Sequence, residues 1–209
     1  MIVHHFTTPI TTPFARKSTQ IYGDLRRLWE KAKIKESAKK PEITGLCRLI
    51  KGYKIMIKVL FVCHGNICRS TMAEYVMKAL VNKSGLSDTF FIDSAATSRE
   101  EIGNPVHYGT RHKLEEVGIY CGNHKARQMQ KHEYDEYDYI IGMDSWNIRN
   151  INRIIGNSDP EGKVSKLLDF TEEKGKDIAD PWYTGDFDTT YRDVKKGCEA
   201  LLNDCLLRF

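Results

Sequence analysis

Residues 58–71 are the stretch that most limits what this chain can fold into. The stretch begins with a short apolar run typical of a strand, followed by eight mostly small or polar positions that start at Cys63. Apolar residues then recur at helical spacing, namely Met72, Ala73, Val76, Met77, Leu80 and Val81. Thr71 and Glu74 have the spacing of a capping box. The pattern predicts strand, loop and helix, with Cys63 at the carboxyl end of the strand and Ser70 at the start of the helix.

A loop between a strand and a helix start is suited to binding a phosphate group. The N-terminus of a helix presents unpaired N–H groups and the positive end of its dipole, and successive loop amides add an anion-binding nest. Gly65 allows the backbone to come close to the ligand, and the planar guanidinium of Arg69 can bind two phosphate oxygens at once. We expect Cys63 to lie at the base of this loop as a thiolate nucleophile.

The bare Cys-x5-Arg pattern from Cys63 to Arg69 is common by chance, so the flanking strand and helix and the Gly-Asn pair carry much of its meaning. The loop amides and the guanidinium would hold the phosphate, which assigns this role to His64, Gly65, Asn66, Ile67, Cys68 and Arg69. Arg69 would also stabilise the transition state. Ser70 is placed to bond to the Cys63 sulfur and stabilise it as a leaving group, to cap the helix, or to do both.

Strand and helix patterns alternate along the rest of the chain. Strands are predicted at residues 57–62, 90–95, 139–143 and 164–168, and helices at 71–83, 105–117, 130–135, 144–154 and 191–207. This alternation predicts an α/β fold in which a parallel sheet has helices on both faces. Ligands bind at the carboxyl ends of the strands in such sheets, which is where the pattern places Cys63.

Charge divides the 209-residue chain into two parts. Residues 1–55 carry 12 Lys or Arg against 4 Asp or Glu, a net +8, whereas residues 56–209 carry 20 against 24, a net −4. A weak helical pattern covers residues 21–40, and Pro41 would end it. The basic arm is either a tether for nucleic acid or a membrane surface, or a disordered or spurious upstream extension. The lack of an aromatic–basic recognition motif favours the second interpretation.

Cysteine usage and the missing export signals indicate the cytoplasm. The spacing of the six cysteines is not that of a disulfide framework, and a catalytic thiolate needs reducing conditions. The first residues lack the apolar segment of a secretory signal. No apolar run is long enough for a transmembrane helix. We therefore expect a cytoplasmic protein without a membrane span.

The loop resembles the phosphate-binding loop of the low-molecular-weight protein tyrosine phosphatases, and the resemblance runs from about Met56 to the C-terminus. Further motifs match in the family's order: Asp93-Ser94-Ala95-Ala96, His124-Lys125-Ala126-Arg127-Gln128, Tyr139-Ile140-Ile141-Gly142-Met143-Asp144 with Asn147, and Asp180-Pro181-Trp182-Tyr183. The resemblance implies a catalytic domain at residues 56–209, with a four-stranded parallel sheet of flavodoxin-like winding and the phosphate loop after its first strand. It implies hydrolysis of phosphotyrosine in proteins or peptides, and of aryl phosphates, through a cysteinyl-phosphate intermediate without metal or cofactor. Nucleic acid is not an expected partner.

The resemblance also assigns roles outside the loop. Asp180 matches the general acid and base of the family, although an Asp-Pro pair taken alone is typical of a simple turn. Asn66, Ser94 and His124 match the hydrogen-bond network that holds the phosphate loop, with Ser70 in support. Cys68 is either a small loop filler or, as the family implies, a resolving thiol that traps the oxidised nucleophile as a reversible disulfide.

Four residues are expected to form the substrate pocket: Ile67, Glu100, Trp182 and Tyr183. Glu100 lies where many family members carry an aromatic residue, and the acidic pair Glu100-Glu101 would repel acidic phosphopeptides. Trp182 and Tyr183 form either a wall of the pocket or a core aromatic pair. Asp144 and Asn147 also match the family, and we expect them to shape the site by pairing with Arg127.

Three other functions remain open at this point. Arsenate reductase shares the fold and the loop but needs two further cysteines close to the first, whereas Cys121 stands alone and Cys198 and Cys205 lie on the last predicted helix. Phosphoarginine phosphatase, from a related branch, usually carries threonine at the position of Ile67. A module that only binds phosphate would not need an intact nucleophile and general acid, which argues against it.

Overall fold

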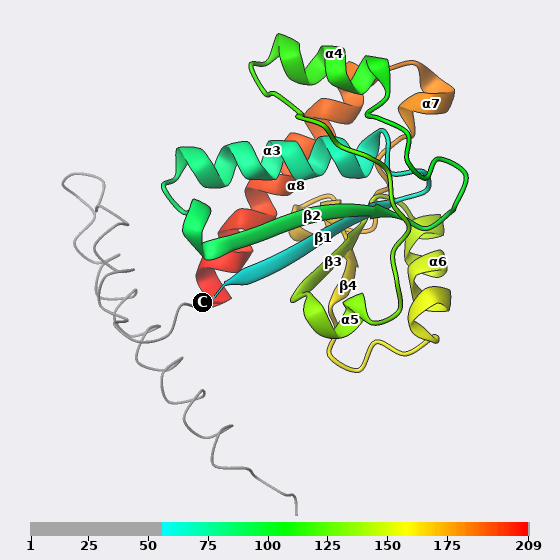
Figure 1. Ribbon diagram of the computed structural model, residues 1–209. Coiled ribbons are helices and arrows are strands. Elements are labelled where there is room, and N and C mark those ends of the chain that lie inside the picture. The colour runs from blue at the N-terminus through cyan, green and yellow to red at the C-terminus, as the bar shows by residue number, and fades with distance from the viewer. Residues whose placement is uncertain (1–55, 209) are drawn as a thin grey trace, which may run out of the picture. The chain divides into compact units, whose positions relative to one another are not determined.

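The computed structural model describes residues 56–208, and the structural findings concern that part of the chain (Figure 1). The basic arm at residues 1–55, including the helix expected within residues 21–40, lies outside the described residues. Helices and strands alternate throughout the described part, which confirms the predicted α/β class. Their arrangement decides where the candidate nucleophile lies.

Four parallel strands form the sheet: β1 (Ile57–Cys63), β2 (Phe90–Ala96), β3 (Tyr139–Gly142) and β4 (Val164–Lys166). Their order is β2-β1-β3-β4, so the strand order reverses between β1 and β3, as in flavodoxin-like folds. The register pairs Cys63 with Ala96 on β2, and Val62 with Gly142 on β3. The predicted parallel sheet is confirmed, with Cys63 at the carboxyl end of an interior strand beside the switch point.

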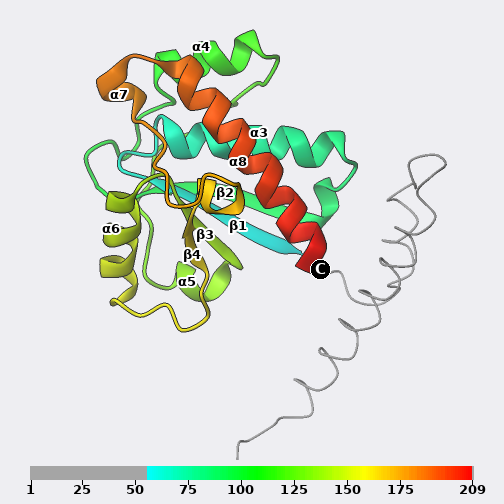
Figure 2. The same ribbon diagram turned by 180° about the vertical axis from the view of Figure 1, so that it is seen from behind.

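Helices cover both faces of the sheet, and Figures 1 and 2 show the two layers. On one face lie α3 (Arg69–Lys83) and α8 (Phe187–Arg208), with α4 (Tyr108–Glu116) beyond α3; on the other lie α5 (Glu133–Glu136) and α6 (Ser145–Ile155). Gly197 allows α8 to pack closely, because a Cβ there would lie 2.5 Å from Cγ of Leu167. Among residues 56–208, no helix has the length and apolar character that crossing a membrane requires.

Side-chain caps move three boundaries away from the predicted ones. The fourth strand ends at Lys166 because the Asp169 carboxylate accepts the Lys166 N–H (2.9 Å) and turns the chain into the 3-10 helix η2 (Leu167–Phe170). Helix α4 begins three residues late, where His107 Nδ1 accepts the Gly109 N–H (3.2 Å). Helix α8 begins four residues early, where Asp186 accepts the Thr189 N–H (2.8 Å). Besides η2, two further short helices, η1 (Ser87–Thr89) and α7 (Pro181–Thr184), were not predicted.

The expected capping box at the start of α3 is wrong. The helix begins at Arg69, and its N-cap Cys68 makes no side-chain capping bond. Thr71 instead donates its hydroxyl to the Asn66 carbonyl (2.9 Å), and the buried Glu74 carboxylate accepts the Ser94 hydroxyl (2.5 Å). Both side chains therefore hold the loop in place, and the backbone N–H groups of the first helical turn remain free to face an anion.

Candidate active site

The loop at residues 63–70 is shaped by Asn66, which has a left-handed backbone conformation (φ 59°) and is fully buried. Its backbone N–H donates to the Cys63 sulfur (3.3 Å), so the loop curls back over the end of β1. Its side-chain amide donates to the hydroxyls of Ser70 (3.0 Å) and Ser94 (2.8 Å), and its side-chain oxygen accepts the Arg127 N–H (3.1 Å). One residue thus ties the loop to α3, β2 and the segment before α5.

The Cys63 sulfur lies in an environment that favours negative charge. It is 3.0 Å from the Ser70 hydroxyl and accepts the Asn66 N–H, and the N-terminus of α3 begins a few residues later. Hydrogen-bond donors and the positive end of a helix dipole both stabilise a thiolate. Ser70 lies within α3 and bonds to the sulfur, so the alternative of Ser70 as the N-cap is wrong.

Two residues behind the loop complete its support, and one of them was missed in the sequence. His124 Nε2 donates to the Asn66 carbonyl (2.9 Å), while its Nδ1 lies 3.8 Å from the carboxylate of Glu74. Glu74 also accepts the Ser94 hydroxyl, so the expected group of Asn66, Ser94 and His124 is joined through this buried carboxylate. The only sequence signal was a charged residue on the apolar face of a helix, a place where burial requires partners.

Arg69 is buried and its guanidinium is fixed by acidic partners on two later segments. Its Nη1 donates to Asp144 (2.5 Å) and to the Ile178 carbonyl (3.1 Å), and its Nη2 donates to Asp180 (2.5 Å). Burial alone would lower the pKa of Arg69, but the negative charges of Cys63, Asp180 and Asp144 raise it above its ordinary value. Its Nε is buried without a hydrogen-bond partner in the described part of the chain, which leaves one donor suited to a phosphate oxygen.

The expected pairing of Asp144 and Asn147 with Arg127 is wrong. Arg127 pairs with Asp93 and Glu133, each at 2.8 Å. Asp144 accepts the Asn147 N–H (2.6 Å) as the N-cap of α6 and turns its other oxygen to Arg69. The reason is the position of the cap at the carboxyl edge of the sheet, where the start of α6 faces the phosphate loop.

Asp180 reaches the site from a turn that is itself capped. Its Oδ1 accepts the Trp182 N–H (3.1 Å) as the N-cap of α7, with Pro181 at the first helical position, and its Oδ2 accepts Arg69 Nη2. The carboxylate that is proposed as the general acid therefore also caps the turn that carries it. Trp182 is 58% exposed and Tyr183 is 85% exposed, which excludes the alternative that they form a core pair.

Glu100 and Glu101 lie at the rim of the loop with different partners. The Glu100 carboxylate is hydrogen-bonded to Nε2 of His64 (2.9 Å), and both side chains are exposed. Glu101 accepts the side-chain amide of Asn104 (2.6 Å) and packs against Gly65, where an added Cβ would lie 3.0 Å from its Cγ. Sequence reasoning named only Glu100 as a pocket residue, so the contact of Glu101 with the loop was missed.

His107 is a third residue missed in the sequence, and it connects the loop to the turn of Asp180. Its backbone N–H donates to the Ile67 carbonyl (2.9 Å). Its ring stacks on Phe187 at a centroid distance of 5.3 Å and meets Trp182 edge-on at 5.6 Å. Gly109 permits the stack, because a Cβ there would lie 2.4 Å from the Phe187 ring. This contact spans segments far apart in the chain, and no local pattern announces it.

Cys68 is a buried free thiol next to the nucleophile. Burial, followed by the negative charge of Cys63, raises the pKa of Cys68 to about 12. Cys68 therefore carries its proton at neutral pH. In the described residues, no three His, Cys, Asp or Glu side chains gather in a way that would hold a metal ion.

Comparisons with known proteins agree with this geometry. Residues 58–207 match the family model described as "Low molecular weight phosphotyrosine protein phosphatase". The chain is 43% identical over 148 residues to the low molecular weight protein-tyrosine-phosphatase YfkJ of Bacillus subtilis, covering 70% of this chain and 94% of that protein. It is 40% identical over 147 residues to the human low molecular weight phosphotyrosine protein phosphatase, covering 69% and 92%.

Solved structures show the same similarity in three dimensions. The crystal structure of Bacillus subtilis YfkJ superposes with a TM-score of 0.70 at 41% identity, covering 75% of this chain and 97% of that one. A Drosophila arginine phosphatase superposes with a TM-score of 0.65 at 29% identity, covering 71% and 98%. The fold is thus shared by proteins named for two different phosphorylated residues.

Proposed function

The chain belongs to the low molecular weight phosphotyrosine protein phosphatase family, and we propose that Cys63, Arg69 and Asp180 carry its hydrolysis of phosphotyrosine. One observation carries the assignment of these residues. The guanidinium of Arg69, which starts α3, bonds to Asp180 from a turn 111 residues later, beside the loop whose donors surround the Cys63 sulfur. Nucleophile, phosphate clamp and acid thus converge on one point at the carboxyl edge of the sheet.

In the first step the Cys63 sulfur attacks phosphorus in line with the tyrosine oxygen. The P–O bond breaks with its electron pair going to the phenolic oxygen, and Asp180 supplies the proton that this oxygen takes. Arg69 and the amides of residues 64–69 bear the charge on the three equatorial phosphate oxygens. The products are tyrosine and a phosphate covalently bound to Cys63.

In the second step water attacks the phosphorus of the cysteinyl phosphate. The Asp180 carboxylate takes a proton from this water, and the S–P bond breaks with its electron pair returning to sulfur. The Ser70 hydroxyl, 3.0 Å from the sulfur, stabilises the leaving thiolate. The phosphate-loop contacts of Asn66, Ser94 and His124 keep the loop in one conformation through both steps, which is how they support the reaction.

The substrate side chain proposed here is phosphotyrosine in a protein or peptide. Ile67 is mostly buried but lines the pocket beside the loop, and the exposed rings of Trp182 and Tyr183 lie on the turn that Asp180 caps. A phenyl ring packs against such surface, whereas a guanidinium would lose hydrogen bonds to water there, at a cost of about 1–3 kcal/mol. The related arginine phosphatase makes phosphoarginine the competing substrate, and a turnover panel decides between them.

We further propose residues 56–209 as the catalytic domain, residues 1–55 as an extension that the fold does not need, and the cytoplasm as the compartment. The family match at residues 58–207 supports this boundary. The free thiols of Cys63 and Cys68 support a reducing compartment.

The test of the mechanism is the fate of the phosphate in Cys63→Ser. We expect no turnover of phosphotyrosine peptide and no covalent phosphate after acid quenching, whereas wild-type protein shows a cysteinyl phosphate. Cys121→Ser serves as the matched control, since Cys121 is also a buried free thiol but takes no part in the loop. Turnover by Cys63→Ser at the wild-type rate would refute the proposed nucleophile.

A further inference from the structure

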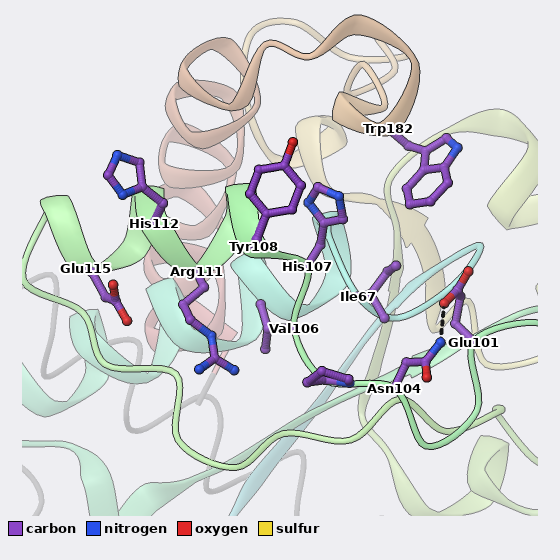
Figure 3. Close-up of a pocket in the computed structure, with 11 residues that line it drawn as sticks. Ile67, Glu101, Asn104, Val106, His107, Tyr108, Arg111, His112, Glu115 and Trp182 are labelled. Carbon is purple, nitrogen blue, oxygen red and sulfur yellow. Dashed lines mark hydrogen bonds between the residues drawn. The ribbon is translucent and has the colours of Figure 1, made fainter.

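A pocket of about 590 Å³ opens beside the phosphate loop and continues along the start of α4 (Figure 3). Ile67 and Trp182 line its end at the loop, so the pocket joins the place where the phosphotyrosine ring would lie. The pocket is much larger than the phenyl ring of a phosphotyrosine, and it is open to solvent. It therefore has room for a second substrate side chain, next to the phosphotyrosine in the peptide.

The end of the pocket at the loop carries one formal charge, the carboxylate of Glu101. Figure 3 shows this carboxylate beside Ile67 and bonded to Asn104, whereas Arg111 and Glu115 lie together toward the other end. Arg111 and Glu115 have opposite charges and share one helix face four residues apart, so together they add no net formal charge to that end. The charge next to the phosphotyrosine position is thus negative.

His107 does not neutralise this charge. Its Nδ1 accepts the Gly109 N–H (3.2 Å), so that nitrogen carries no proton and the ring is neutral. Burial also lowers the pKa of His107, against the opposing pull of Glu101. The rings of His107, Tyr108 and Trp182 line the pocket, and the latter two are mostly exposed. Aromatic faces near a carboxylate are favourable surroundings for a cationic side chain.

We propose that this pocket is a specificity subsite for a lysine or arginine directly adjacent to the phosphotyrosine of the substrate. The cation meets the Glu101 carboxylate, and its aliphatic stem packs on Ile67, Tyr108 and Trp182. The inference rests on the proposed function, since it places the phosphotyrosine ring between Ile67 and Trp182. Glu100 at the rim places a second carboxylate near the same peptide, where it is hydrogen-bonded to His64.

The test compares phosphotyrosine peptides that differ only in Lys, Ala or Glu at the positions directly before and after the phosphotyrosine. At low salt we expect wild-type kcat/KM to favour Lys over Glu by about three- to tenfold at one of the two positions, as a partly exposed charge pair allows. Added salt should reduce this ratio. Glu101→Gln should bring the ratio close to one, and Glu101→Lys should invert it. Each ratio is taken within one variant, so a change in general turnover cancels.

Glu116→Gln is the matched control, because Glu116 lies on α4, pairs with Lys113 (3.1 Å) and does not line the pocket. This variant should keep the wild-type ratio. Equal kcat/KM for Lys and Glu peptides in wild type, or a wild-type ratio in Glu101→Gln, would overturn the subsite. Hydrolysis of a small aryl phosphate, which has no neighbouring side chain to place in the pocket, separates the two claims. If it occurs, only the subsite has failed, and if it does not, the proposed function has failed as well.

Discussion

Replacing Asp180 separates its two roles, as the cap of α7 and as the proton donor. Its Oδ1 accepts the Trp182 N–H and its Oδ2 accepts Arg69, so an asparagine keeps the capping oxygen but has no proton of suitable acidity to give. An alanine loses both functions. Loss of an N-cap costs about 0.5–2 kcal/mol of stability. We therefore expect Asp180→Ala to have a lower melting temperature than wild type, and Asp180→Asn to have a melting temperature close to that of wild type.

The catalytic effect should be larger and should depend on the leaving group. A positioned general acid contributes about 10²–10⁴-fold, equivalent to about 2.7–5.4 kcal/mol of transition-state free energy. We expect both variants to lose this factor on phosphotyrosine peptide, because the tyrosine oxygen leaves as a strongly basic phenolate. The loss should be much smaller on a nitrophenyl phosphate, whose phenolate leaves without a proton. The comparison uses kcat/KM of the two substrates, because this quantity reports the step in which the leaving group departs and not the later hydrolysis of the cysteinyl phosphate, in which Asp180 acts as base for both.

Asp186→Ala is the control for the structural role, since Asp186 also caps a helix start, through the Thr189 N–H, a few residues after the turn. This variant should lower the melting temperature and leave the ratio of the two substrates at its wild-type value. Equal losses by Asp180→Asn on both substrates would mean that Asp180 only maintains the turn and that the acid lies elsewhere.

Three further predictions concern the boundary, the redox chemistry and the substrate. A chain beginning at Met56 should fold and retain full activity, as circular dichroism and phosphatase assays would show; loss of most activity or solubility would contradict the boundary. Cys68→Ser should catalyse almost normally but recover poorly with thiol after mild peroxide, because no neighbouring thiol can trap oxidised Cys63; recovery equal to wild type would exclude a resolving role. Wild type should prefer phosphotyrosine over phosphoserine and phosphoarginine by at least about tenfold in kcat/KM, and Ile67→Thr should narrow the gap to phosphoarginine; comparable wild-type turnover of phosphoarginine and phosphotyrosine would refute this preference.

The arrangement of the cysteines weighs against arsenate reduction. Cys198 and Cys205 are fully buried on α8, and the Cys198 thiol lies 3.6 Å from the Ala73 carbonyl of α3, to which it donates. Burial raises the pKa of Cys198, so this thiol is a poor nucleophile. Thiols fixed between packed helices cannot reach Cys63 in succession, as a cascade of disulfides would require.

The predicted resolving role of Cys68 would depend on the charge of its neighbour. Part of the rise in its pKa comes from the thiolate of Cys63, and burial contributes the larger part. Oxidation of Cys63 to a sulfenic acid removes that negative charge, so the Cys68 thiol then ionises more readily than in the reduced enzyme. We therefore predict that Cys68 can trap oxidised Cys63, and the recovery of Cys68→Ser after peroxide tests this.

The sequence by itself determined the features that depend on neighbouring residues. Apolar periodicity placed the strands and helices, and the run from the end of β1 through Arg69 specified a phosphate loop around Cys63. These features are readable because a strand, a loop and a helix start each follow from a few consecutive side chains. The α/β class and the parallel sheet followed from the alternation of such segments.

Tertiary structure alone decided which side chains meet across distant segments. The sequence suggested that Asp144 pairs with Arg127, but the fold joins it to Arg69, which lies 75 residues earlier in the chain. Glu74 has the spacing of a helix cap, yet its burial beside Ser94 and His124 makes it a support of the loop. A charged group taken from water must find a partner within bonding distance, and only the packing of the elements decides which partner is there.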